Sequence, residues 1–220
     1  MFHVIDEFLA AEEVARLHAL SEQASFVDVK TTNPDFAAKR NLQADPRHQA
    51  AQQAAAMIRE AIRRNEWAME ICRPKALATP MLARYEPGIS YVEHIDTAII
   101  AVNPPIRVDI SCTVFLSDPA AYDGGELTIR PGNREMKIKE PAGAAIFYPS
   151  TTFHQVAPVT RGVRLVALTF IESHVRDPLK RQILYELEEL RHTHARDIGD
   201  EGLTRIEFVR LNLMRLWAGD

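Results

Sequence analysis

Two residues with strong metal-binding side chains, His94 and Asp96, stand two positions apart in the largely apolar segment SYVEHIDTAI. On an extended strand, residues two apart project to the same side, so both groups could reach one ion. A third candidate, His154, lies in YPSTTFHQVAPV, at the start of a later predicted strand. Two imidazoles and one carboxylate leave positions open on a metal, which suits a non-haem Fe(II) oxygenase. The same groups with one water would suit Zn(II) in a hydrolase.

An arginine shortly after the last histidine is expected to bind an organic acid. The segment HQVAPVTRGVRLVALTF contains Arg161 and Arg164. Gly162 is expected to end a turn, which leaves Arg161 in water and places Arg164 on the inward face of the next strand. A guanidinium on an apolar inward face needs an anionic partner. The distal carboxylate of 2-oxoglutarate matches its planar fork, so Arg164 is the predicted cosubstrate ligand.

Short predicted strands surround these residues. From Lys75 to Ser173, β-branched and apolar runs are separated by Pro, Gly, Asn and Asp, a pattern typical of a β-sandwich or barrel. In RVDISCTVFL, alternate residues form an apolar face of Val108, Ile110, Cys112, Val114 and Leu116. The other face holds Arg107, Asp109, Ser111, Thr113 and Phe115. If helices cover the apolar face, the polar face lines a pocket that includes Arg107 and Asp109; otherwise it meets solvent.

Helical patterns flank this strand-rich region. AAEEVARLHALSEQA and HQAAQQAAAMIREAIRRNEWAME predict helices before it, and DPLKRQILYELEELRHTHA and GLTRIEFVRLNLMRLWAG predict helices after it. The C-terminal apolar stripes are Leu179, Ile183, Leu187 and Leu190, then Ile206, Val209, Leu213 and Leu216. We expect them to pack on the sheet, with an interface between identical subunits as the alternative. The expected segments are 1–74 (helical), 75–175 (core) and 176–220 (helical extension).

The early segment KTTNPDFAAKRNLQADPR has no strong period and contains two prolines, so it is predicted to be a long loop. We expect Thr31 to Asp45 to form a mobile lid over the pocket, with Asn41 and Gln43 as candidate substrate contacts. A plain surface connection is the alternative.

Composition restricts the class of protein. The chain has 220 residues, 46% of them hydrophobic, and a net charge of −4, which favours neither a nucleic acid nor a membrane surface as partner. Cys72 and Cys112 lie in apolar surroundings and are expected to be buried free thiols. The N-terminal MFHVIDEFLA lacks the pattern of a signal peptide, and no run of 18 apolar residues occurs. We therefore expect a cytoplasmic protein.

Several motifs occur in a characteristic order: RYEPGISYVEHID, SCTVFLSD, YDGGELTI and AGAAIFYPSTTFHQVAPVTRGVR, with KRNLQAD in the early loop. This order resembles the Fe(II)/2-oxoglutarate oxygenases of the prolyl/lysyl hydroxylase-like group. Over most of its length the chain is similar to the bacterial PKHD-type hydroxylases associated with iron uptake. The resemblance implies a mainly β fold, with a double-stranded β-helix (jelly-roll) core and helices at both ends.

The resemblance also implies roles for individual residues. Fe(II) would be held by His94, Asp96 and His154, and 2-oxoglutarate by Arg164, with Tyr85 lining the cosubstrate pocket. Binding of L-ascorbate is a further expectation of the family. The implied reaction hydroxylates a small molecule or an amino-acid-type substrate with O2 and releases succinate and CO2. A zinc hydrolase and a non-catalytic jelly-roll protein that binds a metal or small molecule remain the alternatives.

Overall fold

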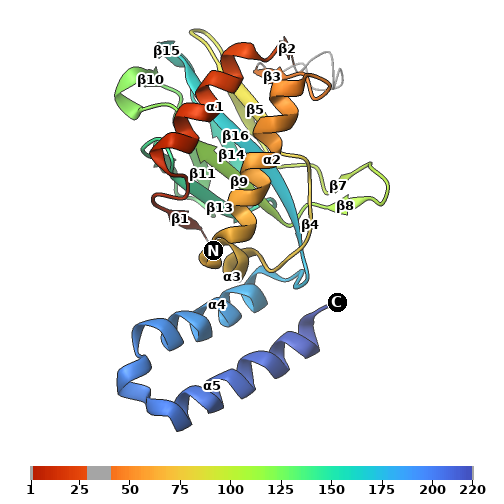
Figure 1. The fold of residues 1–220 in the computed structure, drawn as a ribbon, viewed down its shortest axis with the longest axis vertical. Coiled ribbons are helices and arrows are strands. Elements are labelled where there is room, and N and C mark those ends of the chain that lie inside the picture. Colours follow the sequence, from red (N-terminus) through yellow and green to blue (C-terminus); the bar gives the residue numbers. More distant parts are fainter. Residues whose placement is uncertain (1, 29–40, 220) are drawn as a thin grey trace.

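The computed structural model describes residues 2–28 and 41–219, and Figure 1 shows their arrangement. The helices are α1 (Ala11–Gln23), α2 (Gln49–Arg64), α3 (Glu66–Cys72), α4 (Pro178–Thr193) and α5 (Ala195–Trp217), with a 3-10 turn at Pro119–Ala121. The strands before the site histidines are β1 (His3–Ile5), β2 (Phe26–Asp28), β3 (Leu42–Ala44), β4 (Pro74–Leu77) and β5 (Met81–Tyr85). The middle strands are β6 (Tyr91–His94), β7 (Ile99–Ile100), β8 (Ile106–Arg107), β9 (Ile110–Phe115), β10 (Asp123–Gly124) and β11 (Leu127–Arg130). The last strands are β12 (Met136–Ile138), β13 (Ala145–Pro149), β14 (Phe153–Val156), β15 (Val159–Arg161) and β16 (Arg164–Ser173).

Two antiparallel sheets face each other. The large sheet has the order β1-β13-β9-β16-β5-β3-β2, with β4 also paired to β16, and the small sheet has the order β12-β11-β14-β6. The prediction of a mainly β fold with terminal helices is confirmed. The predicted strands from Met81 to Ser173 are all present, because their apolar periodicity and turn residues are strong local signals.

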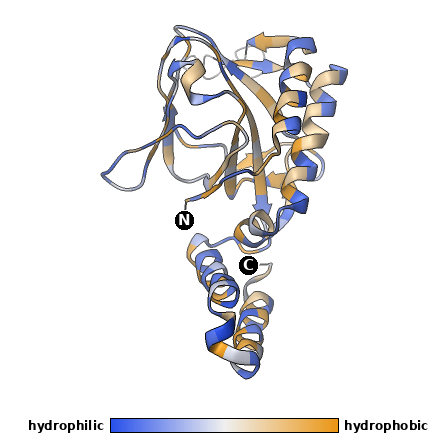
Figure 2. Ribbon diagram, turned by 60° about the vertical axis from the view of Figure 1, so that its left-hand side comes forward, coloured by the Kyte–Doolittle hydropathy of each residue, from blue (hydrophilic) through white to orange (hydrophobic). Residues whose placement is uncertain are grey.

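The two faces of the large sheet are covered differently. On one face, Cys112 and Val114 of β9 pack in a core that includes Leu17 of α1 and Ile58 of α2. On the other face, Phe115 belongs to a second core that lies between the sheets. From Ile110 to Phe115, the predicted division into a helix-covered face and an inward face is therefore confirmed, and Figure 2 shows the hydrophobic colouring that follows the strands.

The N-terminal region contains strands that the sequence analysis missed. Helix α1 is where it was predicted, but the second predicted helix is divided at Asn65, whose side chain accepts a hydrogen bond from the Ala68 amide (2.9 Å) and caps α3. The three-residue strands β1, β2 and β3 are too short to show a period. The expectation of a loop is thus wrong for Leu42–Ala44, since β3 pairs with β5 and β2. The rest of the predicted lid, from Thr31 to Arg40, lies outside the described residues.

The C-terminal helices do not pack on the sheet, which corrects the expectation. Helices α4 and α5 form a hairpin that extends away from the sheets (Figure 1), and α5 has no buried residue. The α4 face turned toward the protein carries Arg181, Leu184 and Glu188, rather than the predicted stripe of leucines. Glu188 can be buried there because its carboxylate is paired with Arg210 at 3.0 Å.

The alternative expectation, an interface between identical subunits, remains a proposal. Leu179, Phe208 and Leu216 on the hairpin are 67%, 70% and 69% exposed, an unusual density of apolar surface for one element. If two copies associate through it, replacing Phe208 and Leu216 together by glutamate converts a dimer into a monomer in light scattering after gel filtration. A monomeric parent protein contradicts the proposal. Val4→Glu, at an exposed apolar position on β1, is the matched control.

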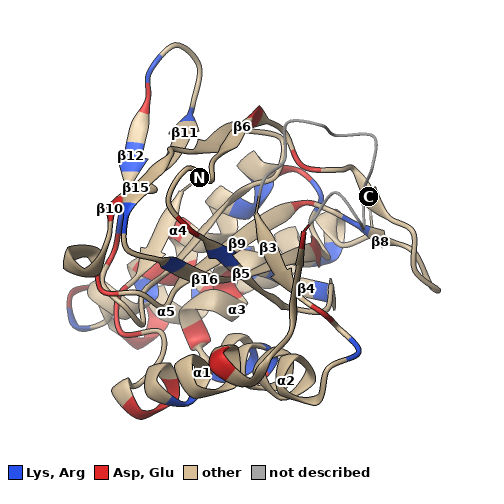
Figure 3. Cartoon of the chain, turned by 90° about the horizontal axis from the view of Figure 1, so that it is seen from above, with Lys and Arg blue, Asp and Glu red and all other residues tan. Residues whose placement is uncertain are grey.

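The cysteines and the charged residues lie as the composition led us to expect. Cys72 and Cys112 are both free and buried, which confirms the prediction of buried free thiols, and burial raises the pKa of each thiol. Basic and acidic residues are mixed over the coloured part of the ribbon (Figure 3). Among the described residues, no helix combines the length and the apolar character needed to cross a bilayer.

Candidate active site

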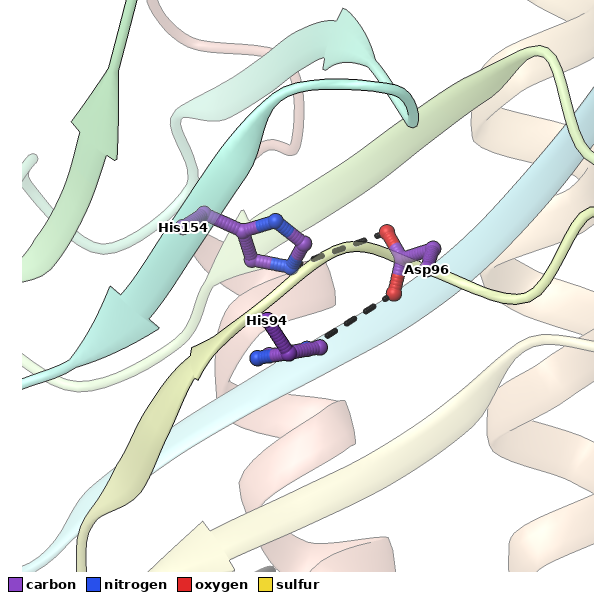
Figure 4. A group of neighbouring side chains, drawn as sticks. All are labelled: His94, Asp96 and His154. Atoms are coloured by element: carbon purple, nitrogen blue, oxygen red, sulfur yellow. Dashed lines mark ion pairs between the residues drawn. The ribbon is translucent and has the colours of Figure 1, made fainter.

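Three side chains from two adjacent strands meet in the space between the sheets. His94 ends β6 and lies directly opposite His154 of β14 in the strand register, with ring centroids 4.2 Å apart. Asp96 follows two residues after His94, where the chain has left the strand. One oxygen of Asp96 lies 3.8 Å from Nε2 of His94 and the other lies 3.6 Å from Nε2 of His154 (Figure 4). The ligand atoms of all three residues lie within 4.8 Å of one another.

Backbone carbonyls fix the orientation of both imidazoles. Nδ1 of His94 donates to the carbonyl of Val92 (2.8 Å), and Nδ1 of His154 donates to the carbonyl of Thr152 (3.0 Å). A carbonyl oxygen can only accept, so the proton of each neutral ring is on Nδ1. The Nε2 lone pairs then point toward the carboxylate of Asp96. Two lone pairs and a carboxylate repel one another unless a cation lies among them, so this donor set fits a metal ion.

Asp96 is held by a pair of serines. Oγ of Ser111 on β9 donates to the Asp96 carboxylate (2.5 Å), and it lies 2.7 Å from Oγ of Ser150. The Asp96 amide donates to the Ser150 carbonyl (3.3 Å). These contacts tie the carboxylate, which lies outside regular secondary structure, to the rigid large sheet.

A cavity of about 430 Å³ leads from these three residues toward a buried arginine. Arg164, the first residue of β16, is 1% exposed, and its Nε and Nη1 have no hydrogen-bond partner among the described residues. Its guanidinium carbon lies 4.8 Å from the ring centroid of Tyr85 and 5.9 Å from that of Phe115. A buried guanidinium with free donors is costly unless an anion occupies the cavity. The cavity therefore suits a small carboxylic acid.

Comparisons with known proteins agree with this geometry. Residues 80–172 match the family model of the 2OG-Fe(II) oxygenase superfamily. A PKHD-type hydroxylase of Sphingopyxis alaskensis is 40% identical over 220 residues, which are 99% of each chain. The PKHD-type hydroxylase YbiX of Escherichia coli is 35% identical over 223 residues, again 99% of both chains.

The chain belongs to the PKHD-type hydroxylases. As a member of this family it is a 2-oxoglutarate-dependent dioxygenase, which decides against the zinc-hydrolase and non-catalytic alternatives. Solved structures show the fold that these hydroxylases share. A prolyl-4-hydroxylase of Pseudomonas putida has a TM-score of 0.55 at 20% identity, covering 78% of this chain and 92% of its own. A prolyl hydroxylase of Trichoplax adhaerens has a TM-score of 0.56 at 17% identity, covering 83% and 86%.

The remaining candidate residues of this PKHD-type hydroxylase fall into two groups. Tyr85, Asn41 and Gln43 line the same cavity as the two histidines. Tyr85 is 2% exposed and accepts a hydrogen bond from Nδ2 of Asn41 (3.3 Å). Arg107 and Asp109 do not line this cavity: they form a two-bonded ion pair (2.8 and 2.9 Å) and line a neighbouring one. The predicted strand is interrupted between β8 and β9, so its alternation of side chains does not continue from Ser111 back to Asp109 and Arg107. This interruption explains why the side chains of Arg107 and Asp109 line a different cavity.

Several residues that contact the site in this hydroxylase were missed by the sequence analysis. Ser111 binds the Asp96 carboxylate, Ser150 bonds to the Ser111 hydroxyl, and Tyr91 packs on His94 with ring centroids 4.2 Å apart. Tyr148 packs edge-on against His154 at 5.2 Å. The alternating face of β9 did predict an inward Ser111. Its partnership with Asp96, however, depends on a tertiary contact that no local pattern reports.

Proposed function

We propose that the protein hydroxylates its substrate while it converts 2-oxoglutarate and O2 into succinate and CO2. One oxygen atom of O2 enters the substrate C–H bond and the other enters succinate. The observation that carries this proposal is the convergence of His94, Asp96 and His154 in one cavity with the unpaired guanidinium of Arg164. A metal-binding set and a carboxylate-binding group in one cavity are what this reaction requires.

In this proposal His94, Asp96 and His154 hold Fe(II), with Nε2 of each histidine and one carboxylate oxygen as the donors. Ferrous iron bound there supplies the redox chemistry that couples decarboxylation of 2-oxoglutarate to hydroxylation. The protein's own part is to hold the donors in place. The carbonyls of Val92 and Thr152 keep the imidazoles in the correct tautomer, and Ser111 keeps the Asp96 carboxylate oriented.

The distal carboxylate of 2-oxoglutarate is assigned to Arg164. The free Nε and Nη1 groups offer hydrogen-bond donors to a carboxylate, and the low exposure of the site strengthens such charge-assisted bonds. Burial raises the pKa of the Tyr85 hydroxyl, despite the opposing effect of the Arg164 charge. Tyr85 therefore stays neutral and can donate a proton in a hydrogen bond to the same carboxylate.

The experiment that tests the proposed function measures succinate release from 2-oxoglutarate under Fe(II) and O2. Fractions of cell extract are added to find those that stimulate turnover. We expect release that depends on Fe(II), is not supported by Zn(II) and falls to background in the His154→Ala protein. Equal succinate release from the wild-type and His154→Ala proteins rejects the assignment.

Gly125 is expected to keep space for the Arg164 side chain. Its φ is +68°, and a Cβ atom there would lie 3.0 Å from Cδ of Arg164 and 3.1 Å from Cε2 of Tyr122. Gly125→Ala is therefore expected to displace the guanidinium and weaken 2-oxoglutarate binding by about tenfold, in addition to a backbone cost of about 1 kcal/mol in stability. Isothermal calorimetry measures the affinity and thermal melting the stability.

Gly132→Ala is the matched control for this prediction. Gly132 has a nearly identical φ of +67°, but a Cβ atom there would meet nothing within 4 Å. This variant should carry the same backbone strain while 2-oxoglutarate affinity stays at the wild-type value. If both alanine variants lose affinity equally, crowding of Arg164 is not the cause.

Three finer expectations remain proposals. Two rest on the resemblance, namely a link to iron uptake and binding of L-ascorbate, and the third is contact of the substrate with Asn41 and Gln43. The division into the segments 1–74, 75–175 and 176–220 is likewise a proposal. Adding ascorbate to the succinate assay tests the second expectation, because an ascorbate-binding enzyme sustains turnover for longer than one kept reduced by dithiothreitol alone.

A further inference from the structure

A second cavity, here called the hairpin cavity, has a volume of about 600 Å³ and lies beside the proposed iron site. Residues 95–98 form one wall, residues 107–109 before β9 and residues 149–151 at the end of β13 form another, and the start of α4 and Trp217 of α5 close the third. Asp96 and Thr97 line both this cavity and the one that leads to Arg164. A ligand in the hairpin cavity therefore lies next to the segment that carries a proposed metal ligand.

The hairpin cavity contains a buried guanidinium that lacks an anionic partner. Arg181, in the first turn of α4, is 2% exposed. Its Nη1 donates to the carbonyls of Val175 and Arg176 (both 2.8 Å). Among the described residues, its Nε has no hydrogen-bond partner. Burial lowers the pKa of Arg181, and the charges of Asp109 and Asp177 oppose that effect without cancelling it.

The acidic residues of the hairpin cavity are already engaged elsewhere. Asp109 accepts hydrogen bonds from Arg107 (2.8 and 2.9 Å) and from the amide of Ser173 (2.9 Å). Asp177 caps α4 by accepting from the amides of Leu179 and Lys180 (2.7 and 3.1 Å). Neither carboxylate forms a hydrogen bond with Arg181 among the described residues, and both act on it only through their charge. The cavity thus keeps one deeply placed positive charge for a ligand.

Beside its polar side chains, the lining contains an apolar surface that includes an aromatic ring. Val108, Pro149, Pro178 and the indole of Trp217 supply it, and Nζ of Lys180 lies 5.8 Å from the Trp217 ring centroid. Such a surface contacts a hydrocarbon or aromatic body rather than a bare inorganic anion. The free Nε donor of Arg181 lies on the Nε–Nη2 edge, the side of a guanidinium that binds a carboxylate through two parallel hydrogen bonds.

We propose that the hairpin cavity is a substrate subsite, in which Arg181 binds a carboxylate and Trp217 contacts the apolar or aromatic body of the same molecule. The inference rests on the proposed hydroxylase function and defines its substrate class as an organic acid larger than 2-oxoglutarate. Held at Arg181, such an acid would reach past Thr97 toward the carboxylate of Asp96. It also gives the C-terminal helices, which add little to the core, a role in specificity.

The first test uses benzoate as the probe and benzyl alcohol as its uncharged control. Trp217 fluorescence reports binding in a Trp67→Phe protein, since Trp67 and Trp217 are the only tryptophans of the chain. We expect saturable quenching by benzoate below about 10 mM, within the range of weak specific ligands, and none by benzyl alcohol. Absence of benzoate binding, or equal binding of the alcohol, overturns the proposal.

Variants assign the carboxylate to Arg181. Arg181→Gln should weaken benzoate binding by about tenfold or more, and Arg181→Lys should restore part of it. Arg205→Gln, on an exposed part of α5, is the matched control and should bind benzoate like the parent protein. Because Arg181 also holds two carbonyls, circular dichroism must first show that each variant is folded. A folded Arg181→Gln protein with unchanged benzoate affinity contradicts the assignment.

A second measurement separates this inference from the proposed function. Visible absorption of the Co(II)-substituted protein reports the surroundings of Asp96, and benzoate should change that spectrum in the parent protein but not in Arg181→Gln. Saturable benzoate binding without a spectral change would show an anion site that is not a substrate subsite. Benzoate quenching that persists in a protein unable to bind Co(II) would mean that the metal assignment has failed while the binding site stands.

Discussion

Replacing His94, Asp96 or His154 by alanine is expected to reduce 2-oxoglutarate turnover to background while the fold is retained. Each residue supplies one of the three donors, which lie within 4.8 Å of one another, and two donors hold Fe(II) much less tightly than three. None of the three side chains is part of the hydrophobic cores, so secondary structure should survive their loss. Titration with Fe(II) measures iron affinity, succinate release measures turnover, and far-ultraviolet circular dichroism measures secondary structure.

An exposed histidine provides the matched control for the alanine variants. His174 follows the end of β16 and is exposed, so His174→Ala should match the parent protein in iron affinity and turnover. Near wild-type iron affinity in two of the three site variants would remove the basis for the metal assignment. Loss of circular dichroism together with activity would instead indicate a structural role for that residue.

Arg164→Ala should weaken binding of 2-oxoglutarate by roughly 2–5 kcal/mol, the usual range when one partner of a buried charge pair is removed. The guanidinium is 1% exposed and has two donors without a partner among the described residues, so its loss leaves the ligand carboxylate without a counter-charge at this point. Arg164→Lys should retain part of the affinity, because the charge survives but the two-pronged geometry is lost. Calorimetric titration of the metal-loaded protein with 2-oxoglutarate measures the affinity of the parent protein and of the Arg164→Ala and Arg164→Lys variants.

Arg161 is the control that the chain itself provides. Its side chain is 61% exposed and forms an ion pair with Asp123 at 2.7 Å, so Arg161→Ala should change 2-oxoglutarate affinity little. Gly162, with φ at +72°, makes the turn that separates the two arginines, as the sequence predicted. Arg161 itself is the last residue of the short strand β15. A damaging Arg161→Ala beside a silent Arg164→Ala would reverse the assignment.

The sequence predicted the parts of the molecule that local patterns encode. The strands around His94 and His154, and the inward face of β9 with Ser111, follow from period-two alternation. The buried position of Arg164 was predictable because a charge at the start of an otherwise apolar strand needs a reason. These inferences needed only neighbouring residues.

The parts that were missed depend on partners distant in the sequence. The stripe on α4 was assigned to the wrong face, since Arg181 and Glu188 are charged and a charged face is normally turned to water. Glu188 is buried because Arg210, from α5, pairs with it. The contact of Ser111 with Asp96 likewise joins different sheets, and β1 to β3 owe their structure to neighbouring strands rather than to their own composition.

The position of β6 gives the proposed iron site a mechanical consequence. β6 is the outermost strand of the small sheet, and its register with β14 is irregular between His154 and Val156. Edge strands with few regular bonds open readily, so β6 is a place where the fold can fray. An ion bound to both His94 and His154 joins the edge strand to its inner neighbour, as a covalent cross-link would. The amides of Tyr91 to His94 should then exchange with solvent more slowly when metal is bound, which makes the loaded enzyme harder to open and the empty one a better substrate for proteases.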